Sequence, residues 1–463
     1  MKKHIIYLAC ALCATTFTAC DDYDIEHTAY DNDRQQNPER QTTTPPTIDD
    51  AWELQLIPDI GRQSDNIFVY KDLKYNRMFC RTQGWTGGIG GITTPLPDGS
   101  VLWAFNTSFF GCVDNTTRTR LNGNEPLNAL LVQRAYGGKL GETQADLVAL
   151  ADYVEWQDAA SEKYFWARTY LRHPNGNKTD SQIEAGEIDT NRYQYVGGAS
   201  TATGKLQMLW RTFNGMTNRV NGTTITQHSL SGTMPANRYT TLLPDYYPQE
   251  GDYMYQEQLL SLYRTESVFY GQALLNADDG HTYLYAVQGT NILVARNTTA
   301  DLTSPWQFYV RNATTGVMEW IDTFPTDEEM ARSNIMANGY VAIMPTVFSD
   351  GGTYYMMSQA AANNTEVYLY KAATPVGPFT DQKMLFNLPS TIDKTGINTY
   401  GTLSQVCAHP ELSRAGELVV SACTSVSTDA DNFTYAGSAD FSRPWFFRVF
   451  NWKHVYDPTG TEQ

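Results

Sequence analysis

The sequence predicts an all-β protein, a five-bladed β-propeller built from four-stranded antiparallel blades. Three observations favour this fold. Apolar and aromatic runs of strand length recur along the chain, with turn sequences such as Asp279-Gly280 and Asp350–Gly352 between them. The 29 Tyr, 19 Phe and 10 Trp residues are spread evenly, and no second linker divides the chain. At roughly 70 to 85 residues a blade, about five blades fit the available length.

Two stretches have the strand spacing of a blade. The first contains the runs Tyr340–Phe348, Thr353–Ala360 and Glu366–Ala372. The second contains the runs Thr282–Ala286, Ile292–Arg296 and Gln307–Val310. Each stretch matches the three inner strands of a four-stranded blade, the unit that radial repetition arranges around a channel. A pair of β-sandwiches is the alternative architecture. Helical patterning is limited to Thr143–Asp152 and Thr326–Met336.

The N-terminus has the pattern of a lipoprotein signal peptide. Lys2 and Lys3 precede the apolar run Ile5–Phe17, and Phe17–Cys20 resembles a lipobox. The apolar run is too short to span a bilayer, so a transmembrane anchor is the weaker interpretation. We therefore expect three parts: a signal peptide over residues 1–19, a lipidated flexible tether over 20–50 that begins at Cys20, and a single β-propeller domain over 51–463.

The tether is strongly acidic. Between Asp21 and Asp50 there are nine acidic residues and two arginines, too few apolar groups to offset chain entropy. Acidic residues directly after the lipidated cysteine resemble the surface-export signal of Bacteroidetes lipoproteins, so we expect an outer-membrane protein, exposed at the surface and held by its lipid anchor. A solvated tether explains the same acids. The net charge of −17, without a basic stripe, argues against nucleic-acid partners.

Four cysteines lie in the predicted domain: Cys80, Cys112, Cys407 and Cys423. In an exported protein they could pair, and Cys407 with Cys423 would suit neighbouring strands of one hairpin. Buried free thiols are an equal alternative. No cysteine or histidine spacing typical of a metal site occurs in the mature chain, so no metal ligand is predicted.

Residues 85–111 carry the most specific pattern in the chain. They run from Trp-Thr-Gly through the Pro95–Gly99 turn to Leu-Trp-Ala-Phe, and resemble the opening blade of bacterial glycoside-hydrolase-like propellers. In those families two Asp residues occupy the positions of Ile89 and Thr107 in this chain. Further segments similar to blades of these families are Ala295-Arg296, Trp306–Tyr309, Glu319-Trp320, Tyr368–Ala372, Gly377–Phe379, His409–Ser413, Gly416–Ser421 and Arg443–Phe446.

The resemblance spans roughly residues 60 to 453. The families that these segments resemble are uncharacterised Bacteroidetes propellers and, more distantly, bacterial endo-D-arabinanases. It implies a five-bladed propeller with a sugar site at the mouth of the central channel. Glycoside hydrolysis normally needs two carboxyl groups that flank the scissile bond, and Ile89 and Thr107 supply neither. A channel Ca²⁺ ion follows from analogy with the family alone; no other cofactor is expected.

Two residues are weak candidates for displaced catalytic groups. Glu266 has Arg264 two residues before it, which places both side chains on one face of a strand. A channel acid and an ordinary surface ion pair both explain that spacing. In the resembling hydrolases a His near the position of His409 often points along the axis; a core histidine with satisfied hydrogen bonds is the alternative. Glu411 could orient His409 or cap a turn.

Aromatic and polar residues in or near the segments that resemble the family are candidates for sugar binding. Pyranose C–H faces stack on aromatic rings, and polar neighbours bind the hydroxyl groups. The candidates are Trp85, Asn106, Thr107, Trp166, Arg168 and Arg443. For most aromatic residues, packing within a blade is the competing explanation. The glycines of Gly87–Gly91 lack the Lys-Ser/Thr and the helix of a phosphate loop, so we expect them to allow close backbone approach.

A hydrolase-like scaffold without its acids predicts a cell-surface glycan-binding lipoprotein that captures an oligosaccharide or polysaccharide for a carbohydrate-utilisation system. An active, arabinanase-like glycoside hydrolase with displaced carboxylates is the first alternative. A partner-binding outer-membrane component, which docks a transporter through one propeller face, is the second.

Overall fold

The computed structural model describes residues 45–456 except 59, 63, 151–152, 158–162, 168–181, 183–190, 215–218, 230–252, 255–267, 340, 342–343, 360–363, 389–401 and 426–430. The predicted signal peptide, Cys20 and most of the tether lie outside these residues. Within them, no helix is both long and apolar enough to cross a membrane.

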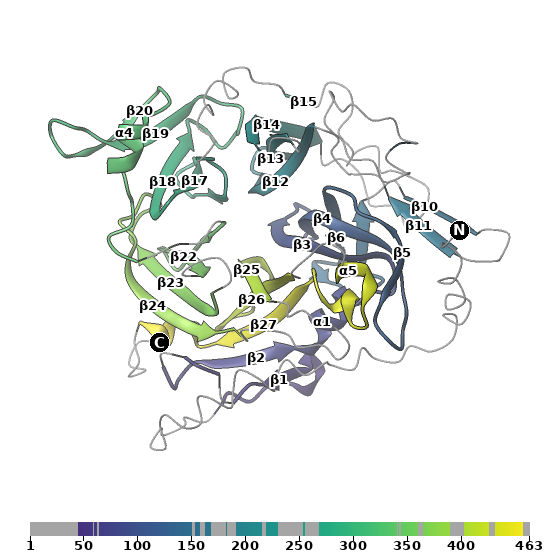
Figure 1. Cartoon of the computed structure of the whole chain (residues 1–463). Helices are drawn as coiled ribbons and strands as arrows, with labels where there is room; N and C mark the ends of the chain where they lie inside the picture. Colours follow the sequence, from purple (N-terminus) through teal and green to yellow (C-terminus); the bar gives the residue numbers. More distant parts are fainter. Residues whose placement is uncertain are drawn as a thin grey trace.

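Five antiparallel sheets are arranged around a common axis, which confirms the five-bladed propeller (Figure 1). Blade 1 contains β3 (Gln83–Pro95), β4 (Val101–Val113), β5 (Arg120–Asn124), β6 (Ala129–Gln133) and β9 (Leu147–Leu150). Blade 2 contains β12 (Asn191–Ser200), β13 (Lys205–Asn214), β14 (Arg219–Ser229) and β15 (Tyr253–Met254). Blade 3 contains β16 (Ala273–Asn276), β17 (Thr282–Gln288), β18 (Asn291–Asn297), β19 (Trp306–Arg311) and β20 (Met318–Ile321).

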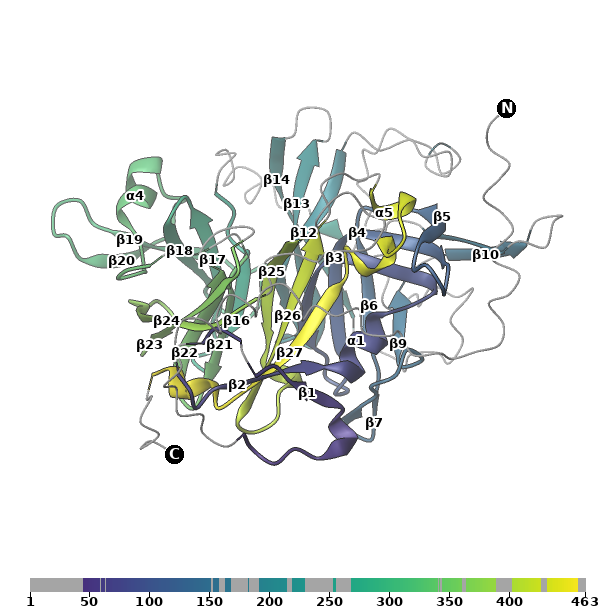
Figure 2. The same cartoon turned by 60° about the horizontal axis from the view of Figure 1, so that its bottom comes forward.

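The last two blades complete the ring. Blade 4 contains β21 (Thr346–Asp350), β22 (Thr353–Gln359), β23 (Glu366–Ala372) and β24 (Thr380–Asn387). Blade 5 contains β25 (Thr402–His409), β26 (Glu417–Ser425), β27 (Pro444–Phe450), β2 (Phe68–Asp72) and β1 (Leu54–Leu56). The strands β3, β12, β16, β21 and β25 are the innermost of their blades (Figures 1 and 2).

Short elements surround the blades. The hairpins are β7 (Ala135–Tyr136) with β8 (Lys139–Leu140) and β10 (Tyr153–Gln157) with β11 (Lys163–Ala167). The helices are α1 (Leu73–Phe79), α4 (Asp327–Arg332) and α5 (Asp431–Thr434), with the 3-10 turns η4 (Asp50–Trp52), η5 (Pro410–Leu412), η6 (Ser438–Asp440) and η7 (Trp452–Val455).

The ring is closed by the N-terminal part of the described chain. Strand β2 pairs antiparallel with β27, with Phe68 opposite Phe450, and β1 continues the sheet outward. Buried charges reinforce this seam, since Arg448 on β27 donates to Asp72 at 2.6 Å and also donates to Glu417 on β26. Blade 5 is therefore assembled from both ends of the sequence.

An aromatic cluster fills the space between blade 1 and blade 5. Phe79, at the end of α1, has no exposed surface and packs on Trp85, Trp103 and Phe446 with ring centroids 5.8, 4.8 and 5.0 Å away. Helix α1 begins at Asp72, whose carboxylate accepts from the Tyr75 backbone N–H at 2.8 Å. The cap and the aromatic cluster together fix the helix against the closing seam.

The predicted runs coincide with β21–β23 of blade 4 and with β17–β19 of blade 3, but in blade 3 the innermost strand is β16, so those runs are its second to fourth strands. One helix prediction is wrong. Residues 143–152 contain β9, because pairing with β6 outweighs a short helical pattern. Helix α4 lies inside the predicted 326–336, and Thr326 and Glu329 form a capping box at its start. Cys112, Cys407 and Cys423 are buried and form no disulfide, so Cys407 and Cys423 do not pair.

Candidate functional site

A cavity of about 310 Å³ lies on the propeller axis, lined by residues of all five innermost strands. We call it the axial cavity. Its polar lining includes Thr93, Thr94, Gln272, Asn276, Thr346 and Glu411, and its apolar lining includes Ile92, Ala199, Leu274, Val347 and Phe348. A concave, mostly neutral site with a few converging polar groups is typical of small-ligand binding.

Glu411 is the one carboxyl group among the described residues that line the axial cavity. It lies in η5, directly after β25, and its side chain is 17% exposed. Burial raises the pKa of Glu411 to about 7, although a hydrogen bond with Thr93 acts in the opposite direction. The carboxyl group is therefore poised to gain or lose a proton near neutral pH.

His409 lies behind the cavity wall, with no exposed surface. One ring nitrogen, Nδ1, is 2.6 Å from Thr93 Oγ1, and Nε2 is 2.7 Å from Ser421 Oγ. Burial lowers the pKa of His409 to about 3, so the imidazole is neutral, donating through one nitrogen and accepting through the other. Nδ1 lies 3.9 Å from Glu411 Oε1. His409 thus fixes Thr93, which in turn contacts the cavity carboxyl.

The residues at the family's acid positions do not line the axial cavity. Ile89 and Thr107 are half-buried, in the middle of β3 and β4. Asn106 bridges two blades, because its amide donates to the Tyr195 carbonyl at 2.9 Å and accepts from the Tyr195 N–H at 2.8 Å. Both polar groups of the Asn106 amide are therefore used to join blade 1 to blade 2, and in this conformation they are not available to a ligand.

The remaining sequence candidates fall into two groups. Trp85 is fully buried and donates to Ser108 Oγ at 3.3 Å, so neither ring face is open to a sugar in this conformation. Arg443 is also buried; it donates to Asp440 at 3.2 Å and stacks over Trp445. Trp166 lies on β11, with its side chain outside the description, and Arg168 and Glu266 lie outside the described residues.

The glycines of β3 permit a close backbone approach. The Gly88 N–H donates to the Ser442 carbonyl at 2.6 Å, and a Cβ atom on Gly87 would lie 2.6 Å from the same oxygen and 2.3 Å from Arg120 Nη2. Arg120 is buried and donates to the carbonyls of Ser438 and Phe441, each at 2.8 Å. The glycines therefore make room for the arginine that holds residues 438–442 against blade 1.

Gly87→Ala is expected to lower the free energy of unfolding by about 1 to 3 kcal/mol, because the new methyl group overlaps backbone and a buried guanidinium. Urea denaturation measures this. Gly137→Asn is the matched control, since its φ of +59° suits Asn and nothing lies within 4 Å of its Cβ position. Equal stability of both variants would contradict the close packing at Gly87.

No cluster of three His, Cys, Asp or Glu side chains that could hold a metal occurs in the described part of the chain. Ca²⁺ takes six to eight oxygen ligands, and the described lining of the axial cavity offers one carboxyl group together with neutral hydroxyl and amide oxygens. The calcium ion implied by analogy stays a prediction.

Sequence reasoning weighed Glu411 as a support for His409 or a turn cap, and it missed Thr93, Gln272 and Asn276 as cavity residues. Thr93 lies on β3, whereas Gln272 and Asn276 lie just before and at the end of β16, far apart in sequence from Thr93. No local signal brings these residues together, because they meet only where the innermost strands of different blades converge.

Comparisons with known proteins agree with this architecture. The model of the family described as a domain of unknown function, DUF5005, matches residues 72–452. The structure of a "putative hydrolase" from Bacteroides ovatus is 38% identical, with a TM-score of 0.78, over 91% of this chain and 99% of that chain. No curated protein matches significantly.

Two further solved structures have much lower similarity. A GH43_1 enzyme from Xanthomonas citri in complex with xylotriose is 13% identical, with a TM-score of 0.34, over 81% of this chain and 92% of that chain. An exo-1,5-α-L-arabinanase from a bovine ruminal metagenomic library is 10% identical, with a TM-score of 0.34, over 79% and 94%. The family match covers most of the chain, and the chain therefore belongs to the DUF5005 family.

Proposed function

We propose that this protein binds carbohydrate through its axial cavity and is held at the outer surface of the cell by a lipid on Cys20. The resemblance of residues 85–111 to glycoside-hydrolase-like propellers supports a carbohydrate-related role, and the relative from Bacteroides ovatus is described as a "putative hydrolase". The lipobox-like segment Phe17–Cys20 and the acids after it support the surface location.

One observation carries the choice of binding over cleavage. Glu411 is the single carboxyl among the cavity residues described, and Ile89 and Thr107 stand where the resembling families have acids. Hydrolysis of a glycosidic bond needs two carboxyl groups, about 5 to 10 Å apart, on opposite sides of the bond. One carboxyl group without its partner can hold a sugar but does not complete either hydrolytic mechanism.

The cavity chemistry suits a sugar. A protonated Glu411 both donates and accepts hydrogen bonds, as a hydroxyl group requires, and the Thr93 hydroxyl beside it does the same. Apolar side chains such as Leu274 and Val347 provide surface for the C–H faces of the ring. At about 310 Å³ the axial cavity has room for the end of a glycan.

The pKa of Glu411 also favours a second candidate function, that of a glycoside hydrolase. A pKa near 7 suits a general acid, which must be protonated to donate to the leaving oxygen. This alternative requires a second carboxylate at the cavity. Release of reducing sugar that Glu411→Gln abolishes would establish it.

The test is calorimetric titration with arabinan, xylan, mannan and host glycans, together with an assay for reducing sugar. Binding without sugar release, weakened at least tenfold by Glu411→Ala, supports the proposal. Glu328→Ala, at an exposed position in α4, is the matched control and should bind normally. Absence of binding to every glycan would reject the proposed function.

The affinity should depend on pH. Below about pH 7 Glu411 is protonated and can donate to a sugar hydroxyl; above it the ionised group can only accept. We expect affinity to fall about 3- to 10-fold from pH 6 to pH 8, the effect of one hydrogen bond. The Gln variant, whose amide stays neutral, should give a flat profile.

Protein stability provides an independent readout of the same carboxyl. Because the folded pKa is raised, the contribution of Glu411 to stability is complete below about pH 4.5 and is lost as the pH rises through 7. In Glu411→Gln this part of the pH dependence should vanish. An unchanged stability profile in the variant would show that Glu411 has an ordinary pKa.

A further inference from the structure

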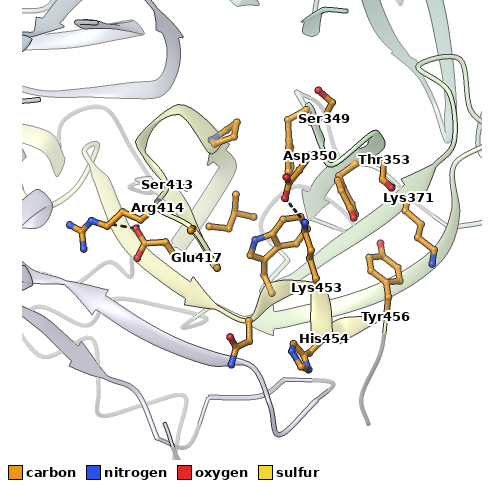
Figure 3. A pocket seen from close by; sticks show the side chains of 18 residues that line it. Ser349, Asp350, Thr353, Lys371, Ser413, Arg414, Glu417, Lys453, His454 and Tyr456 are labelled. Carbon is orange, nitrogen blue, oxygen red and sulfur yellow. Dashed lines mark hydrogen bonds and ion pairs between the residues drawn. The ribbon is translucent and has the colours of Figure 1, made fainter. Parts of the chain in front are cut away.

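A second cavity, of about 800 Å³, lies between blade 4 and blade 5 (Figure 3). We call it the lateral groove. It is bounded by the end of β21, by residues 413–418 before and within β26, and by residues 451–456 at the C-terminal end of the described chain. Phe348, Ser349 and Pro410 line both the lateral groove and the axial cavity, so the two cavities adjoin.

Four side chains that line the lateral groove have buried polar atoms without a hydrogen-bond partner in the described chain. The atoms are Arg414 Nη1, Glu417 Oε2, His454 Nδ1 and Tyr456 Oη. The Glu417 side chain has no exposed surface, and its other oxygen accepts from the Arg414 N–H at 3.0 Å. Buried polar atoms in native proteins nearly always have partners, so four such atoms around one cavity point to a polar ligand.

The charges of the groove are mutually paired, which favours an uncharged ligand. Asp350 and Lys453 form an ion pair at 2.7 Å, visible near the centre of Figure 3. Lys371 lies 3.5 Å from Asp381, and Glu417 also accepts from the buried Arg448. With the ions already neutralised, the unpartnered atoms include donors and acceptors, the combination that a hydroxyl group satisfies.

Aromatic side chains supply the apolar part of the lateral groove. Tyr355, Trp452 and Tyr456 line it, with the Tyr355 and Trp452 rings 4.9 Å apart in an edge-to-face arrangement. Lys371 Nζ lies 4.6 Å from the centre of the Tyr456 ring, at the exposed rim. Tyr355 and Trp452 are 6% and 4% exposed, so the half-buried Tyr456 offers the ring surface on which a sugar face can stack.

We infer that the lateral groove continues the axial cavity and that the two hold one oligosaccharide, with its terminal residue at Glu411 and the following residues beside Tyr456. This inference rests on the proposed function. The inference predicts that contacts in the lateral groove, between blades 4 and 5, determine the preference for glycan length. Contacts in the axial cavity determine which terminal sugar binds.

Tyr456→Phe tests the inference without disturbing the fold, because the hydroxyl it removes has no partner in the described chain. The probes are the monosaccharide, trisaccharide and hexasaccharide of the arabinose, xylose and mannose series, titrated by calorimetry. We expect about a 3- to 10-fold loss of affinity for a hexasaccharide and no change for the monosaccharide. Tyr136→Phe, at an exposed tyrosine remote from the groove, is the control.

The outcomes separate the two proposals. Unchanged hexasaccharide affinity in Tyr456→Phe, together with a loss in Glu411→Ala, would reject the lateral groove and keep the axial site. An equal loss for monosaccharide and hexasaccharide would also reject it, because the effect would then not depend on length. If the unchanged protein binds none of the probes, both proposals fall. Thermal denaturation of each variant checks that folding is intact.

Discussion

Arg448→Met is expected to lower the free energy of unfolding by about 3 to 5 kcal/mol, the usual result of removing one partner from a buried ion cluster. Arg448, Asp72 and Glu417 are all at most 3% exposed. Their contacts join β27 to β2 and β26 at the seam that closes the ring. Without the guanidinium, the buried Asp72 carboxyl loses its ion-pair partner, and the buried Glu417 keeps only Arg414, whose Nε lies 3.9 Å away.

The loss of stability in Arg448→Met should grow as the pH rises. Burial already raises the pKa of Asp72, although Arg448 opposes that shift, and without Arg448 the pKa would rise further. A raised carboxyl pKa gives stability that is lost as the pH increases, so the variant should be most impaired above neutral pH. Chemical denaturation at pH 5 and pH 8 measures both effects.

Lys453→Met is the matched control for Arg448→Met. Lys453 also pairs with a carboxylate, Asp350, but it is 51% exposed, so its loss should change stability by less than about 1 kcal/mol. Similar costs for the two variants, or a cost for Arg448→Met that does not vary with pH, would show that the buried cluster does not hold the seam.

Phe79→Ala is the second substitution with a large expected effect, a loss of about 3 to 5 kcal/mol from an emptied aromatic core site. Its ring contacts the rings of Trp85, Trp103 and Phe446, which come from three different strands of blades 1 and 5. Such a cavity cannot collapse easily, because its walls are strands held by their own sheets.

Phe79→Leu separates the effect of lost side-chain volume from the effect of lost aromatic ring contacts. It keeps most of the apolar volume and should cost less than half as much as the alanine variant. Equilibrium unfolding gives the free energies, and near-ultraviolet circular dichroism reports the tryptophan environment. A cost below about 1 kcal/mol for Phe79→Ala would mean that α1 contributes little to the joint between the first and last blades.

The fold could be predicted because its signals are local. Strand-length runs and turns such as Asp279-Gly280 recur in every blade, and the runs assigned to blades 3 and 4 match β17–β19 and β21–β23. Closure could not be predicted, because it depends on β2 pairing with β27 across the whole chain. Helix α1 was missed because seven residues give too short a period to detect.

The candidate site was harder to predict than the fold. Trp85 borders the glycine-rich segment, which made it a candidate for an exposed ring. However, β3 is buried on both faces for much of its length, so a residue's place along this strand does not indicate whether its side chain is exposed. Glu411 follows His409-Pro410 in a short turn, and nothing local indicates that five strands meet there. The chemistry of a single carboxyl group depends on its burial, which arises only after the ring has formed.

The pairing of β2 with β27 has a consequence for biosynthesis. The strands made first have their native partner in the strand made last, so the circle stays open until residue 450 has left the ribosome. During that interval β2 and β26 each present an unpaired edge, the kind of surface through which chains aggregate. Translation that stops short of β27 yields an open arc of blades with both of these edges unprotected.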